Sequence, residues 1–140
     1  MIRFFTEDVV FSLPQKLAVK KWLAAQTLAE GHQLGDLNFV FASDEYVMEV
    51  NREHLNHDYY TDIITFDNRE HPTDPLEGDI FISTERVADN AAQLGLAPDQ
   101  EMRRVMAHGL LHLCGFGDKS EADQAVMRQK EEAWLAGFGA

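Results

Sequence analysis

The stretch HGLLH at residues 108–112, six residues before Asp118, decides both the fold and the chemistry expected of this chain. Its two histidines, His108 and His112, are four residues apart, and residues four apart on a helix lie on the same face. Both imidazoles can therefore reach one metal ion. If Asp118 supplies a third ligand from the loop after the helix, a fourth position stays open for water, which is the arrangement of a catalytic zinc site.

The residues around this stretch favour a metal site over two imidazoles that are only buried and hydrogen-bonded. The predicted helix begins at Pro98-Asp99 and is apolar around the histidines, so their nitrogens need partners. Glycine inside a helix is about 1 kcal/mol less stable than alanine. A glycine at position 109 therefore indicates that another part of the chain approaches the helix backbone closely there. The break at 115–117 can turn Asp118 back toward the histidines. Such ligands suit zinc, with nickel, manganese or iron as alternatives.

Three further residues of this region are candidates for a role beside the histidines. Glu101 and Arg104 share the helix face of the histidines, and three interpretations stay open. They could form a surface ion pair, orient an imidazole, or aim the arginine at an anionic substrate. Cys114 is predicted to be a small buried hydrophobe. Gly109 occupies the position where the common zinc peptidase motif has its glutamate base, which argues against a peptidase.

Composition sets the class of protein. The 140 residues predict one domain, spanning residues 1–140, and the single cysteine excludes an internal disulfide. We expect a cytoplasmic protein, because neither a signal peptide nor a run of ~20 apolar residues is found. The net charge of −12 is unusual for a nucleic-acid binder, which would need a basic patch or a metal ion to offset the repulsion.

Periodicity and turn residues predict alternating strands and helices. The interleaving of the two suggests a small sheet with helices packed on it. Apolar alternation and β-branched residues predict strands at 2–5, 37–41, 61–66 and 78–83. Amphipathic spacing with capping residues predicts helices at 16–29, from Ser43 or Asp44 to about 51, at 84–94, from 98 to the glycine at 115, and at 120–134.

Three motifs together resemble the YbeY family, bacterial endoribonucleases also described as rRNA maturation factors. The segment 61–66 matches the family's Thr-Asp-Val-Leu-Ser-Phe with conservative changes, and 78–83 matches Gly-Asp-Ile-x-Ile-Ser. The segment 108–116 matches His-Gly-x-Leu-His-Leu-x-Gly-Tyr, with phenylalanine at the last position. Order and spacing agree from about residue 35 to 135, so the combination is highly specific.

The resemblance implies a compact α+β fold with a small mixed sheet of about four strands and about five helices. It implies a single-strand-specific, metal-dependent endoribonuclease of 16S rRNA maturation and ribosome quality control. Its partners would be single-stranded RNA, the ribosome and ribosomal proteins, with no membrane. We expect the metal ligands to be His108, His112 and Asp118. The expected catalytic residues are His108 and Arg104, and the expected substrate contacts are Arg104, Asp62 and Ser83.

Two positions depart from the family pattern. Asp118 stands where the third ligand is usually histidine, and it adds a negative charge to the site. Leu55 stands where the family usually has an arginine, for which Arg52, His54 or His57 are candidate substitutes. Two rival functions stay open. One is a zinc metallopeptidase-like hydrolase, and the other is a non-catalytic ribosome assembly factor with a structural metal.

Overall fold

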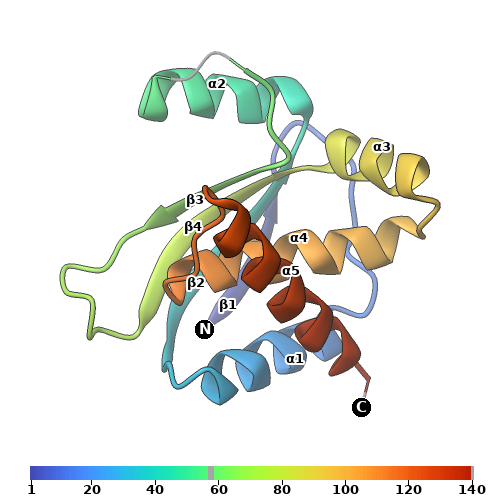
Figure 1. The fold of residues 1–140 in the computed structure, drawn as a ribbon. Helices are drawn as coiled ribbons and strands as arrows, with labels where there is room; N and C mark the ends of the chain where they lie inside the picture. The colour runs from blue at the N-terminus through green and yellow to red at the C-terminus, as the bar shows by residue number, and fades with distance from the viewer. Residues whose placement is uncertain (57–58, 140) are drawn as a thin grey trace.

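A four-stranded mixed sheet forms the centre of the computed structural model, which describes residues 1–56 and 59–139 (Figure 1). The strands run in the order β1-β2-β4-β3, with β1, β2 and β4 parallel and β3 antiparallel to β4. The predicted α+β class is confirmed. The strands are β1 (Ile2–Thr6), β2 (Leu34–Ala42), β3 (Ile63–Asp67) and β4 (Leu76–Ser83). The helices are α1 (Lys16–Ala29), α2 (Asp44–Leu55), α3 (Thr84–Leu94), α4 (Pro98–Leu113) and α5 (Glu121–Ala136).

Helices cover both faces of the sheet, and the alternation of side chains along β4 shows how. Ile80 and Ile82 belong to the main core, which β4 shares with α1 and α4. Phe81, between them, points to the opposite face and packs in a smaller cluster with residues of α2. Successive side chains of a strand point to opposite faces, so β4 is buried on both sides. This explains the unbroken apolar run at residues 80–82.

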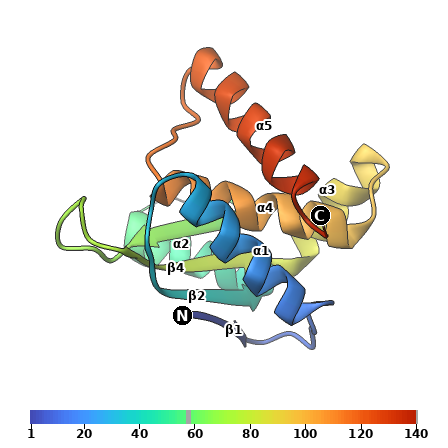
Figure 2. The same ribbon diagram turned by 90° about the horizontal axis from the view of Figure 1, so that it is seen from below.

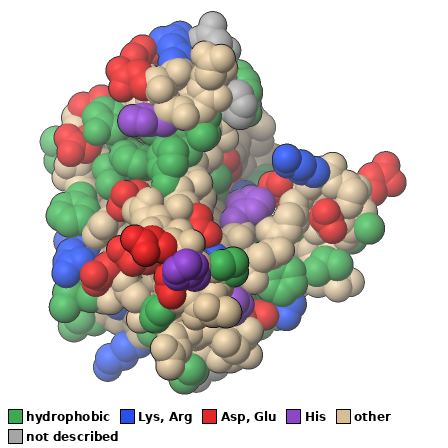
Figure 3. Space-filling view, turned by 90° about the vertical axis from the view of Figure 1, so that its left-hand side faces the viewer, with side chains coloured by type: hydrophobic (Ala, Val, Ile, Leu, Met, Phe, Trp, Pro, Cys, Tyr) green, Lys and Arg blue, Asp and Glu red, His purple; other side chains and the backbone are tan. Residues whose placement is uncertain are grey.

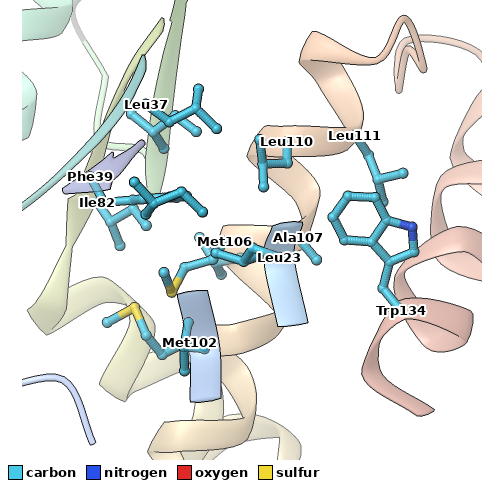
Figure 4. Close-up of a cluster of buried hydrophobic side chains, with 14 of the residues drawn as sticks. Leu23, Leu37, Phe39, Ile82, Met102, Met106, Ala107, Leu110, Leu111 and Trp134 are labelled. Carbon is cyan, nitrogen blue, oxygen red and sulfur yellow. The ribbon is translucent and has the colours of Figure 1, made fainter. Parts of the chain in front are cut away.

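Helix α4 is held between the sheet and α5 (Figure 2). On its sheet side, Met106 and Leu110 face Leu37 of β2 (Figure 4). On its other side, Leu111 lies beside Trp134 of α5 (Figure 4). Close packing of this kind on both sides fixes the helix in position. The two histidines near its C-terminal end are therefore carried by one of the most constrained elements of the molecule.

Side-chain caps begin three of the helices. The Ser43 and Ser120 hydroxyls accept hydrogen bonds from the Tyr46 and Asp123 backbone N–H groups, at 3.1 and 3.0 Å, as predicted for these helix starts. The Ser83 hydroxyl accepts from the Arg86 N–H at 3.0 Å and caps α3. These bonds satisfy backbone donors that the first turn of a helix leaves without partners.

Gly78 permits the close pairing of β3 and β4. A Cβ atom at this position would collide with the backbone oxygen of Phe66, which the strand ladder holds in place. We expect Gly78→Ala to lower the free energy of unfolding by about 1–3 kcal/mol, measured by urea denaturation. The control is Gly117→Ala, because a Cβ there would lie 3.4 Å from the Asp123 carboxylate, an ordinary contact. Equal stabilities of the two variants would contradict this account of Gly78.

Candidate metal centre

His108, His112 and Asp118 converge at the C-terminal end of α4. The Nε2 atoms of His108 and His112 are 2.9 Å apart. The Asp118 Oδ2 atom lies 3.3 Å from each of them. These three residues are the only group of histidine, cysteine and carboxylate side chains within residues 1–56 and 59–139 that is arranged to hold a metal ion.

The spacing of these atoms fits a small divalent cation. A tetrahedral zinc ion binds nitrogen and oxygen at about 2.0–2.2 Å, which separates its ligand atoms by roughly 3.3–3.6 Å. The observed separations of 2.9, 3.3 and 3.3 Å are close to these values. The donor set of two imidazoles and one carboxylate also suits zinc, although it does not exclude nickel or manganese. The group could therefore hold a divalent metal ion.

The loop after α4 brings Asp118 back to the histidines. Gly115 has φ +104°, which is favourable for glycine, and it turns the chain away from the helix axis. Gln124 then donates a hydrogen bond of 3.1 Å from Nε2 to the backbone oxygen of Asp118. The glycine break after α4 was predicted to return Asp118 in this way, and the structure shows that it does.

A buried carboxylate lies behind the first histidine. Glu131 of α5 is 4% exposed, and its Oε2 atom is 2.6 Å from Nδ1 of His108. An ionised carboxylate can only accept, so Nδ1 carries the proton and the Nε2 lone pair faces the other two ligands. Burial acts to lower the His108 pKa, but the hydrogen bond and charge of Glu131, with Asp118 and Asp62, outweigh burial and raise it. This arrangement is typical of metal-binding histidines.

Arg104 joins two carboxylates behind His108. Its guanidinium donates to Glu101 from Nε at 2.7 Å and to Glu131 from Nη1 at 3.2 Å. Glu101 is completely buried. The hydrogen bond to Glu101 is the main cause of the raised pKa of Arg104. Of the three interpretations left open by the sequence, this geometry favours the one in which Arg104 orients an imidazole.

The three ligands lie on the wall of an open groove of about 620 Å³. The free edge of the sheet at β3 forms one side of the groove, and the end of α4 forms the other. Figure 3 views this side of the molecule and shows histidine at the wall of a hollow. Asp62, Asp67 and Lys119 also line the groove. A solvent-open groove beside a group of metal-ligating side chains is the usual place for a catalytic site.

The structure brings some of the other predicted site residues to this groove and keeps one away. Asp62 lines the groove, and so does Leu55, which is 40% exposed. The position at which the family usually has an arginine therefore faces the site. Ser83 is completely buried, where its hydroxyl caps α3 and donates to Asp44 at 3.1 Å. Its hydroxyl is not available to a substrate in the groove.

Of the three candidate substitutes for the missing arginine, the two that the structure describes do not line the groove. Arg52 pairs with Glu49 at 2.8 Å. His54 packs edge-on against Phe66, with ring centroids 5.8 Å apart. His57 lies outside the described residues. Cys114 is half-buried, and burial is the main cause that raises its thiol pKa to about 11, so it is neutral at physiological pH, as expected for a hydrophobe.

Two residues that sequence reasoning did not single out support the site. Arg69, in the connection between β3 and β4, donates from Nη2 to the Leu113 carbonyl at 2.9 Å and so satisfies the end of α4. The same guanidinium binds Asp67 at 2.9 and 2.7 Å, which lowers the Asp67 pKa. Glu131 is the other missed residue. Its one signal in the sequence is its place between Met127 and Trp134 on the buried stripe of α5.

The comparisons with known proteins agree with this geometry. The family model described as "Endoribonuclease YbeY" matches residues 6–139. The chain belongs to the YbeY family. Among curated relatives, the endoribonuclease YbeY of Cytophaga hutchinsonii is 47% identical over 96% of this chain and 94% of its own length. That of Christiangramia forsetii is 46% identical over 98% of this chain and 94% of its own length.

A solved structure supports the fold alone. The solution structure of TM1509 from Thermotoga maritima superimposes with a TM-score of 0.70 at 24% identity, over 99% of this chain and 89% of that one.

The YbeY family model and its curated relatives confirm two predictions, the family and the endoribonuclease activity. An endoribonuclease is a hydrolase. The peptidase and non-catalytic alternatives are not favoured.

Proposed function

We propose that this YbeY endoribonuclease cleaves single-stranded RNA with a zinc ion held by His108, His112 and Asp118. The observation that carries the proposal is the convergence of the three ligand atoms on the wall of a solvent-open groove. Bound there, the metal would supply Lewis acidity and positive charge beside an RNA phosphodiester. That positive charge also offsets part of the net charge of −12, which otherwise repels a polyanion.

The protein's own residues prepare the site. Glu131 keeps Nδ1 of His108 protonated and fixes the ring, and Arg104 holds the Glu131 carboxylate in place. We therefore assign Arg104 a positioning role in place of direct phosphate contact. Asp118 adds a negative charge that a histidine would not bring, which favours retention of a divalent cation. Asp62 remains the proposed substrate contact, since it lines the groove.

Gly109 supplies a structural reason against the peptidase alternative. A Cβ atom at this position would lie 2.9 Å from Cδ1 of Ile63 and 3.3 Å from two atoms of Ile80. The position therefore faces the sheet, while His108 and His112 face the groove. A general base of the kind that zinc peptidases place after the first histidine has no room here.

We further propose that the RNA is the 16S rRNA precursor, and that the protein works on the ribosome, with ribosomal proteins as partners, in the cytoplasm. The family assignment supports this proposal. No helix in the described part of the chain has the length and apolar character needed to cross a bilayer.

Purified, untagged protein tests the proposed chemistry. We expect it to contain about one zinc ion per chain, to cleave a single-stranded RNA and to leave casein intact. A chelator should abolish the cleavage, and added zinc should restore it, because the ligands cannot act without the ion. Cleavage that survives complete removal of the metal would contradict the proposal. Zinc-loaded protein that leaves RNA intact would instead support a structural metal.

A further inference from the structure

Few of the positive side chains in this acidic protein are free to bind a ligand. Of its 12 lysines and arginines, most are held by carboxylates or lie over aromatic rings. For example, Arg86 pairs with Asp44 at 2.6 Å. Within the described residues, four of these side chains make no hydrogen bond, ion pair or ring contact: those of Lys16, Lys21, Lys119 and Arg128.

Two of these four cations flank the metal ligands. Lys119 lines the groove beside β3. Arg128 lines a second hollow, of about 280 Å³, between α4 and α5. His108 and Asp118 line both hollows, so the metal-ligating group lies where the two meet. Lys16 and Lys21 are both on α1 and line neither hollow.

The groove carries more negative than positive charge, so an RNA strand needs cations in it and beside it. Three carboxylates line it, those of Asp62, Asp67 and Asp118. Lys119 is the only lysine or arginine among the described residues that line it. Leu55 brings no charge to its place in the groove. A single RNA strand across the ligands places phosphates on both sides of the one that is cleaved, and these phosphates need positive partners.

We propose that Lys119 and Arg128 bind the RNA phosphates on opposite sides of the cleaved one. The strand then crosses the metal ligands from the groove beside β3 into the hollow between α4 and α5. The guanidinium of Arg104, which also lines that hollow, is occupied by Glu101 and Glu131, whereas that of Arg128 is not. This path rests on the proposed RNA substrate and specifies where the strand lies.

The test compares Lys119→Ala and Arg128→Ala with Lys21→Ala, which removes the same charge from a free cation on α1. A fluorescently labelled oligouridine is bound to each protein in the presence of a chelator, and anisotropy gives Kd at several salt concentrations. Each site variant should weaken binding several-fold and reduce the slope of log K against log salt by about 0.7, the value for one phosphate contact on a single strand. With zinc present, each should raise KM more than it lowers kcat.

Equal salt slopes for the two site variants and Lys21→Ala would overturn the proposal. A change in only one of the two would also overturn it, because the crossing path requires both. Zinc content measured on every variant separates a lost phosphate contact from a damaged metal site. If the unaltered protein binds the oligouridine but never cleaves it with zinc, the proposed function fails while the binding path still stands.

Discussion

The His112→Ala variant should lose both its bound metal and its activity on RNA. His112 supplies one of the three ligand atoms, and its Nε2 lies 2.9 and 3.3 Å from the other two. Two remaining ligands hold a zinc ion far more weakly than three, so the variant should purify without zinc and cleave single-stranded RNA at the background rate. Elemental analysis and an RNA cleavage assay measure the two losses.

The control for this variant is His71→Ala. The His71 side chain is exposed in the connection between β3 and β4 and lies outside the metal-ligating group. Alanine suits the interior of a helix, so His112→Ala should fold. The melting temperature of His112→Ala should equal that of the unaltered protein measured in chelator, because neither protein is then stabilised by bound metal. Full cleavage by metal-free His112→Ala protein would refute the mechanism.

The sequence predicted the exact limits of two helices that lie next to proline or glycine. It did not predict the limits of elements that depend on pairing between distant segments. Proline or glycine flanks α1 and α3, and both have the predicted limits. β2 begins at Leu34, earlier than predicted, because Leu34 pairs with Leu76 of β4, which no local pattern reveals. α2 continues past its predicted end at about residue 51 to Leu55, and Asn56 closes it in a left-handed conformation.

The candidate site divides in the same way. The three ligands lie within a short stretch of sequence, so helix geometry and one glycine break were enough to place them together. Glu131 and Arg69 come from separate elements, and only the packing of α5 and of the β3–β4 connection brings them to α4. Ser83 was expected to contact substrate, but its hydroxyl instead accepts the hydrogen bond that caps α3.

Replacing Glu131 with glutamine should weaken zinc binding by about 10–100-fold, the usual effect of losing a partner of a ligating histidine. Glu131 is 4% exposed, and its carboxylate binds both His108 and Arg104, at 2.6 and 3.2 Å. Glutamine has nearly the same shape but no charge, and its amide can either accept from or donate to Nδ1 of His108, so it fixes the proton on Nδ1 less strongly. Competition with a zinc indicator gives the affinity, and melting in chelator shows whether the fold is kept.

Glu132→Gln is the matched control, since Glu132 is exposed on the same helix and loses the same charge. If Glu131 acts through His108, excess zinc should restore much of the cleavage by Glu131→Gln, because the three ligands are still present. A role in direct substrate contact would leave zinc affinity unchanged and would not respond to added metal. A purely structural role would lower the melting temperature in chelator. Only the positioning role predicts weak zinc binding, an intact fold and rescue by zinc together.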